Sequence, residues 1–149
     1  MYKRFLFEGD VHRTLATIPL SIRRKLDLSG QKLSLAGWEA LSREERLCLC
    51  HMPVDGEGDL DVYREVLAGF ATRAGVPALP LFGDPIDPAA WSAARLAPRL
   101  RAKLGDAKTP GEDRLGALGE EERYALFKLS EPRREPDKLV AVLGELGLG

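Results

Sequence analysis

The sequence is poor in the residues that form metal, haem and disulfide centres. Among its 149 residues are two cysteines, two methionines and two histidines. The cysteines, Cys48 and Cys50, are separated by one residue, and a helix does not easily bring such a pair into disulfide geometry. The chain therefore lacks the disulfide framework of a small secreted protein.

Long apolar runs and an excess of one charge are missing as well. The longest apolar stretches are far shorter than the ~20 residues of a membrane-spanning helix, and no apolar run of signal-peptide length precedes Glu8 and Asp10. With 22 basic and 23 acidic side chains, the formal net charge is −1, so no global field attracts nucleic acid or a membrane surface. We expect a cytoplasmic protein without a nucleic-acid or membrane partner.

Motifs of known catalytic centres are not apparent. The sequence has no glycine-rich phosphate loop, and neither His12 nor His51 has an obvious nucleophile or carboxylate partner nearby in the chain. We therefore assign no catalytic residue and expect no cofactor, although an uncharacterised enzyme stays open as an alternative.

The sequence does contain short amphipathic segments separated by prolines, glycines and helix caps. Ser34 precedes one segment as an N-cap, and Ser42 with Glu45 forms a capping box at the start of the next. Thr109 and Glu112 have the same spacing, with a proline at the first helical position between them. No β-type alternation is sustained. We predict an all-α fold, with helices near residues 21–28, 35–41, 43–51, 59–74, 88–97, 98–104, 110–118, 120–129 and 137–146.

Several apolar positions are expected to face a core. Trp38 lies on the apolar side of its short helix and is predicted to be buried. The spacing in two longer helices predicts one face with Val62, Val66, Leu67 and Phe70, and another with Leu139, Val140, Leu143 and Leu146. Pro98 is expected to separate two helices. Residues 5–7 are expected to form a short strand or an extended arm.

Two parts of the chain resemble each other. Residues 40–49 align with residues 117–126 at six identical positions of ten, and residues 23–26 align with residues 101–104 after a gap of one residue. The matching segments occur in the same order, with caps at similar places. We predict one domain over residues 1–149, built from repeats near 18–53 and 96–132 with approximate two-fold symmetry and a linker near 76–87.

Four motifs of this chain resemble those of the conserved nitrate reductase-associated protein family. They are Phe5-Leu6-Phe7-Glu8-Gly9-Asp10, residues 18–27, residues 30–35 followed by Trp38 and Leu41, and Arg123-Tyr124-Ala125-Leu126-Phe127-Lys128-Leu129-Ser130. Together they span nearly the whole chain. The resemblance implies an association with nitrate assimilation and implies no known activity.

The chain departs from the pattern of that family at several positions. Thr17 and Ser29 stand where the family tends to have cysteine, and Leu115 where it tends to have a second tryptophan. Arg134-Glu135 replaces a histidine-glutamate pair. A role that depends on those cysteines or that histidine could not operate in this chain.

Two constellations look like metal sites but do not have the required spacing. In Cys48-Leu49-Cys50-His51-Met52, residues two apart on a helix point about 200° apart, so the two cysteines cannot face one ion. We expect Cys48 to be a small core residue and His51 a cation at the end of its helix. The alternating acids of residues 55–61 lack both the glycine and the closing glutamate of a calcium loop. We therefore predict no metal site.

The paired basic segments are the best candidates for a binding surface. Arg23 and Lys25 match Arg101 and Lys103 in the repeat, and Arg46 matches Arg123. These six side chains could hold an anion or a partner protein, or they could lie on solvated helix faces. The favoured hypothesis is a non-enzymatic accessory or regulatory protein that binds a protein partner, possibly in nitrate assimilation. The alternatives are a protein that binds a small ligand or anion through the paired basic segments, and an uncharacterised enzyme; the oligomeric state is left open.

Overall fold

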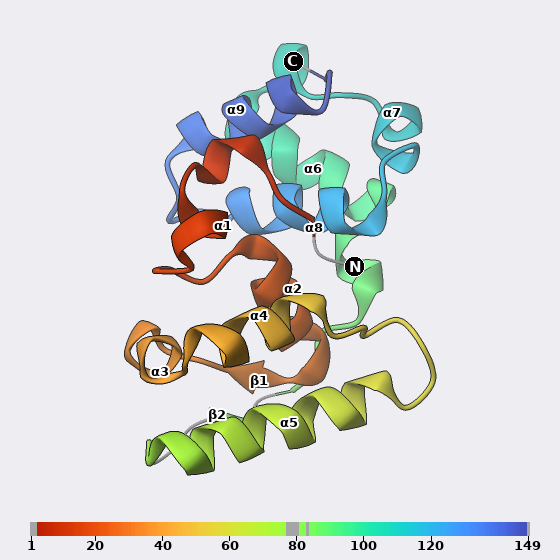
Figure 1. Ribbon diagram of the computed structural model, residues 1–149. Coiled ribbons are helices and arrows are strands. Elements are labelled where there is room, and N and C mark those ends of the chain that lie inside the picture. Colours follow the sequence, from red (N-terminus) through yellow and green to blue (C-terminus); the bar gives the residue numbers. More distant parts are fainter. Residues whose placement is uncertain (1–2, 77–80, 83, 149) are drawn as a thin grey trace. The chain divides into compact units, whose positions relative to one another are not determined.

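The computed structural model describes residues 3–76, 81–82 and 84–148 (Figure 1). Apart from a two-stranded antiparallel ladder, the regular elements within these ranges are helices, and the prediction of an all-α fold is confirmed. The ladder joins β1 (Gln31–Lys32) to β2 (Leu81–Phe82), with Gln31 opposite Phe82. Within the same ranges, no helix combines the length and apolar character that crossing a membrane would require.

The described residues form two compact units. The first unit contains residues 3–4 and 10–86, and the second unit contains residues 5–9 and 87–148. The boundary after Ile86 falls inside the predicted linker, of which residues 77–80 and 83 lie outside the described ranges. The single-domain organisation and the two-fold symmetry stay predictions.

The first unit contains five α-helices in its described part. They are α1 (Val11–Thr14), α2 (Leu20–Ser29), α3 (Leu35–Ala40), α4 (Arg43–His51) and α5 (Asp59–Ala74). Helix α2 packs against α4 and α5. The predicted caps are confirmed: the Ser34 hydroxyl accepts the Gly37 amide, and Ser42 and Glu45 form the complete capping box that starts α4.

Trp38 lies in the core of the first unit, as predicted. Its side chain is fully buried, and its indole nitrogen donates to the carbonyl oxygen of Leu15 at 2.7 Å. Leu15 follows α1 with a φ of 52°, an unusual left-handed conformation for leucine. The buried side chain of Leu15 and the hydrogen bond to its carbonyl hold this conformation in place.

The second unit surrounds a core of aromatic and leucine side chains. Its elements are η1 (Leu6–Glu8), η2 (Pro88–Trp91), α6 (Ala93–Leu104), η3 (Asp106–Lys108), α7 (Glu112–Gly116), α8 (Glu120–Leu129) and α9 (Pro136–Glu145). Helix α6 packs on α7 and α8, and α8 packs on α9. Trp91 and Tyr124 meet edge to face, with ring centroids 4.9 Å apart.

Local predictions fail at three places in the second unit. Pro98 lies inside α6, because the helix break falls at Ser92, whose hydroxyl accepts the Arg95 amide as an N-cap. Thr109 does not cap α7, because its hydroxyl donates to the Gly105 carbonyl and Gly111 is the N-cap. Residues 5–7 belong to the 3-10 turn η1 and its N-cap, so the predicted strand or extended arm is wrong.

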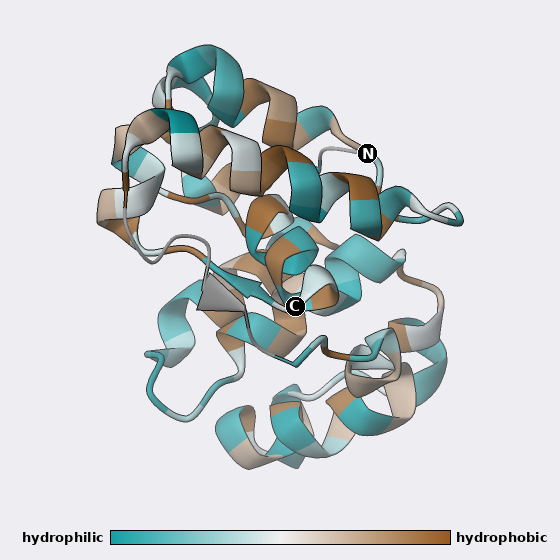
Figure 2. Ribbon diagram, turned by 90° about the horizontal axis from the view of Figure 1, so that it is seen from below, coloured by the Kyte–Doolittle hydropathy of each residue, from teal (hydrophilic) through white to brown (hydrophobic). Residues whose placement is uncertain are grey.

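The faces of the two longer apolar helices also differ from the prediction. In α5 the buried positions are Tyr63, Leu67 and Ala71, whereas Val62 is half exposed. In α9 the buried positions are Leu139, Val142 and Leu143, whereas Val140 is half exposed. Figure 2 shows hydrophobic and hydrophilic residues alternating along the helices, as amphipathic helices require. The periodicity located each helix and correctly predicted the burial of Leu67, Leu139 and Leu143, but it missed the buried Tyr63, Ala71 and Val142.

Candidate functional site

Lys25, one of the predicted binding residues, is a buried cap for the end of α4. Its side chain is fully buried, and its ammonium donates to the carbonyl oxygens of Cys50 at 2.5 Å and Met52 at 2.7 Å. A third carbonyl, that of Leu49, lies 3.4 Å away. A cation at a helix C-terminus stabilises the unpaired carbonyls and the negative end of the helix dipole.

The matching side chains make related contacts within their own units. Lys103 donates to the carbonyl of Glu131, just after α8, at 2.6 Å. Arg46 donates to the carbonyls of Trp38 and Glu39 at the end of α3, and Arg123 donates to that of Leu118 after α7. Lys25, Lys103, Arg46 and Arg123 therefore each donate to carbonyl oxygens at, or just after, the C-terminal end of a helix.

The remaining two predicted binding residues are placed differently. Arg23 lies on α2 and is half-buried, while Arg101 on α6 is exposed and pairs with Asp106, their charged atoms 3.0 Å apart. The two paired basic segments belong to different units. The hypothesis that an anion lies between them stays a prediction.

Cys48 is exposed and Cys50 is fully buried. The prediction that Cys48 is a core residue is wrong, and Cys50 takes that place in the first unit. In the part of the chain that the structure describes, no three cysteine, histidine or carboxylate side chains converge in a way that could hold a metal ion.

Shifted pKa values in the first unit have structural causes. Hydrogen bonds from Arg73 to both carboxylate oxygens of Glu45 lower the pKa of Glu45, and they raise the pKa of Arg73. Burial raises the pKa of the Tyr63 hydroxyl, with smaller contributions from Cys50 and Cys48. The Tyr63 hydroxyl lies 3.4 Å from the carbonyl oxygen of Leu49, so it also serves the end of α4.

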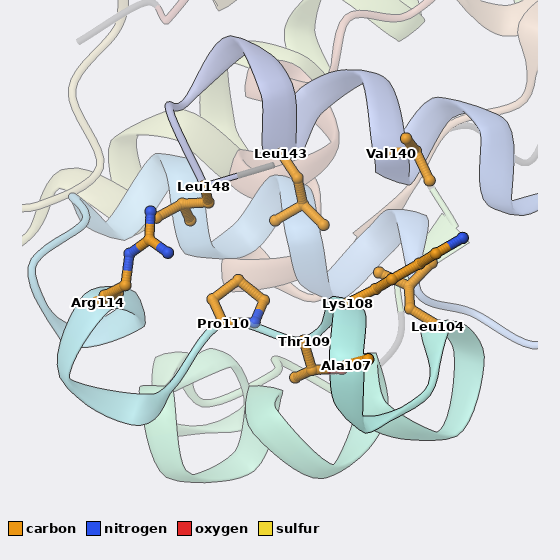
Figure 3. Close-up of a pocket in the computed structure, with 9 residues that line it drawn as sticks. All are labelled: Leu104, Ala107, Lys108, Thr109, Pro110, Arg114, Val140, Leu143 and Leu148. Atoms are coloured by element: carbon orange, nitrogen blue, oxygen red, sulfur yellow. The ribbon is translucent and has the colours of Figure 1, made fainter.

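The second unit contains a pocket of about 390 Å³ between α9 and the segment that joins α6 to α7. Figure 3 shows Leu143 pointing into this pocket from α9, with Pro110 on the opposite side. The lining is mainly apolar, and the residues that form it are Leu104, Ala107, Lys108, Thr109, Pro110, Arg114, Val140, Leu143 and Leu148. A cavity of this size and character is typical of small-molecule sites.

The turn that follows α9 forms one wall of the pocket. The Leu148 amide donates to the Leu143 carbonyl at 2.8 Å, and the Gly147 amide donates to the Gly144 carbonyl at 3.1 Å. Gly147 has a φ of 76°. These are the bonds and the left-handed glycine of a Schellman motif, which commonly brings the residue after the glycine onto the last turn of the helix. Leu148 and Leu143 thus line the pocket together.

Two cationic side chains lie at opposite ends of the pocket (Figure 3). Arg114 of α7 is next to Leu148 and donates to the Gly147 carbonyl at 2.9 Å. Lys108 of η3 extends towards the end formed by Leu104 and Val140. Within the described part of the chain, Lys108 makes no hydrogen bond or ion pair. The sequence analysis missed this site; only the glycine near the end of the predicted last helix could have indicated its wall.

Comparison with known proteins identifies one family. The model of the conserved nitrate reductase-associated protein family matches residues 4–146. No curated protein and no solved structure matches the chain.

Proposed function

The chain belongs to the conserved nitrate reductase-associated protein family, and from this premise we propose that it is a non-enzymatic accessory or regulatory protein whose partner is a nitrate reductase. The observation that carries the proposal is the family match, which spans both units of the chain. An accessory protein acts through its surface, so the proposal requires an exposed site that a partner can recognise.

The turn η1 offers such a site in the second unit. Leu6 is 84% exposed, the largest fraction among the exposed large apolar side chains of the described residues. Its neighbours fix the turn: Phe5 is buried, and the Phe7 amide donates to a carboxylate oxygen of Glu145 on α9 at 3.1 Å. Single exposed leucines are common in soluble proteins, but this one is held on a rigid turn, so that a partner would lose little conformational entropy by binding it.

The test uses the purified full chain and the purified nitrate reductase of the organism that encodes it. Biolayer interferometry with the immobilised chain should give saturable binding with a Kd of about 10 μM or tighter. Leu6→Ser should weaken binding about tenfold or more, as expected for an apolar anchor. Val62→Ser is the matched control, because Val62 is also exposed but lies on α5 of the first unit.

Two outcomes would contradict the proposal in different ways. If the wild-type chain shows no binding at about 100 μM, far above the affinities of functional complexes, nitrate reductase is not its partner. If the reductase binds the wild-type chain but Leu6→Ser and Val62→Ser change the Kd to the same extent, nitrate reductase is the partner and η1 is not the contact. Reductase activity measured with and without the chain then shows whether the association is regulatory.

A further inference from the structure

We propose that the pocket of the second unit binds a small amphipathic anion, with an apolar body between α9 and Pro110 and an acidic group on Arg114. This inference goes beyond the proposed partner binding, because it concerns a small ligand, and its test contains no reductase. It depends on the shape of the pocket, on its apolar lining and on its two cations.

The apolar part of the pocket selects the body of the ligand. Leu143, Leu148 and Pro110 present hydrocarbon to the cavity, and Val140 and Leu104 continue this surface towards the other end. Contact with such a lining removes apolar ligand surface from water, which favours an alkyl chain or an aromatic ring. The volume of about 390 Å³ is sufficient for a ligand of this kind.

Arg114 selects the charge of the ligand and orients it. Its hydrogen bond to the Gly147 carbonyl occupies one terminal nitrogen and holds the guanidinium beside Leu148. The other N–H groups of a guanidinium can donate to a carboxylate, sulfonate or phosphate oxygen, and a guanidinium held in this way loses little freedom on binding. Lys108 adds a second positive charge at the other end of the lining.

Lys108 differs from the capping side chains described above, whereas Arg114 resembles them because it donates to a carbonyl just after a helix, that of Gly147 after α9. Lys25 and Lys103 direct their ammonium groups at carbonyl oxygens of helix ends. Lys108 has no such contact in the described residues, although it lines an apolar cavity. Because Lys108 is exposed, water solvates its ammonium, and the ammonium is available to pair with an anionic group that a ligand places at that end of the pocket.

The experiment compares two fluorescent probes of nearly the same shape. 8-Anilinonaphthalene-1-sulfonate carries a sulfonate, and N-phenyl-1-naphthylamine has the same ring system without it. The folded full chain should bind the sulfonate probe at one site with a Kd of tens of micromolar, and the neutral probe about tenfold more weakly. Decanoate should displace the sulfonate probe competitively, whereas decanol should do so less effectively.

Variants at the pocket separate the contribution of the positive charges to ligand binding from that of the apolar lining. Arg114→Gln should weaken binding of the sulfonate probe about tenfold and change binding of the neutral probe less than about twofold. Lys108→Gln should have a smaller effect in the same direction, because no hydrogen bond in the described residues holds its ammonium in place, whereas a hydrogen bond to the Gly147 carbonyl holds the guanidinium of Arg114. Val140→Trp should weaken both probes by narrowing the cavity, and because Val140 is half exposed, this variant should fold. Lys138→Gln is the control, since Lys138 is an exposed lysine of α9 that does not line the pocket.

Several results would overturn the proposal. One is the absence of saturable binding at a single site by the wild-type chain. Another is that Arg114→Gln and Lys138→Gln weaken binding of the sulfonate probe equally, which would mean a nonspecific effect of charge. A third is equal sensitivity of both probes to Arg114→Gln, which would assign Arg114 to the pocket wall and not to an anion. Circular dichroism checks whether each variant keeps its fold. If Arg114→Gln is unstable, Lys108→Gln and the comparison of the two probes on the wild-type chain test the charge, and Val140→Trp tests the location of the site.

Discussion

Replacing Lys25 by methionine should destabilise the first unit strongly, although the sequence alone suggested a binding role for this lysine. Methionine keeps most of the length of the side chain and removes its charge. The carbonyls of Cys50 and Met52, at 2.5 and 2.7 Å, would lose a charged donor. Hydrogen bonds to charged groups contribute about 1.5–3 kcal/mol each, and relief from burying an ammonium offsets part of that loss. We expect a net loss of about 2–4 kcal/mol.

Lys103→Met provides the matched comparison in the second unit. Lys103 donates to one carbonyl, that of Glu131, and is only half-buried, so its loss should cost about 1 kcal/mol. Urea unfolding followed by tryptophan fluorescence separates the two units, because Trp38 lies in the first and Trp91 in the second. Each measurement is made with the other tryptophan replaced by phenylalanine. If Lys25→Met costs under about 1 kcal/mol, a value typical of surface changes, the reasoning about the helix cap is refuted.

Three further outcomes are expected. Trp38→Ala should lower the free energy of unfolding by about 3–5 kcal/mol, because the ring is fully buried; a loss under about 1 kcal/mol in urea titrations would mean that the ring is exposed. Glu45→Gln keeps the cap on the Ser42 amide but removes the ion pair with Arg73. The pKa of Glu45 is lowered in the folded state, so its ionised form stabilises the fold fully above the ordinary pKa of about 4, and this contribution is lost as the pH falls through the lowered value. The wild-type chain should therefore have a larger free energy of unfolding than Glu45→Gln near neutral pH, and the difference should disappear in acid. A difference that persists in acid would contradict this explanation. Protein made without an affinity tag should contain no stoichiometric zinc, iron or copper by elemental analysis, and a metal lost on replacement of Cys50 or His51 would show otherwise.

The structure suggests why the two halves of the sequence look alike. Helix α3 begins at Leu35 and α7 at Glu112, 77 positions later, and the same separation relates α4 at Arg43 to α8 at Glu120 and α5 at Asp59 to α9 at Pro136. The matched basic residues contact carbonyls at equivalent helix ends in each unit. Duplication stays a prediction, and superposing residues 20–51 on 99–129 tests it.

Local interactions determined where many of the helices begin and end. Ser34, Ser42 and Glu45 start helices because their side chains reach backbone amides only a few residues away. The end of α2 at Gly30 and of α5 at Gly75 depends on a left-handed glycine at each position. Such signals act over one turn of chain, so they can be recognised without knowledge of the rest of the molecule.

Tertiary contacts determined the roles of the charged residues and the location of the pocket. No local pattern indicates that Lys25 is buried against carbonyls more than 20 residues away, or that Arg114 meets the Gly147 carbonyl. At Thr109 and Pro98 the chain offered local alternatives: the Thr109 hydroxyl donates to the Gly105 carbonyl instead of capping α7, and the break before α6 falls at Ser92 instead of Pro98. The sequence by itself determined that the chain is helical and where most helices begin, because those interactions are local. Only the tertiary structure decided which side chains are buried and which of them surround a cavity, because these properties depend on segments brought together from distant parts of the chain.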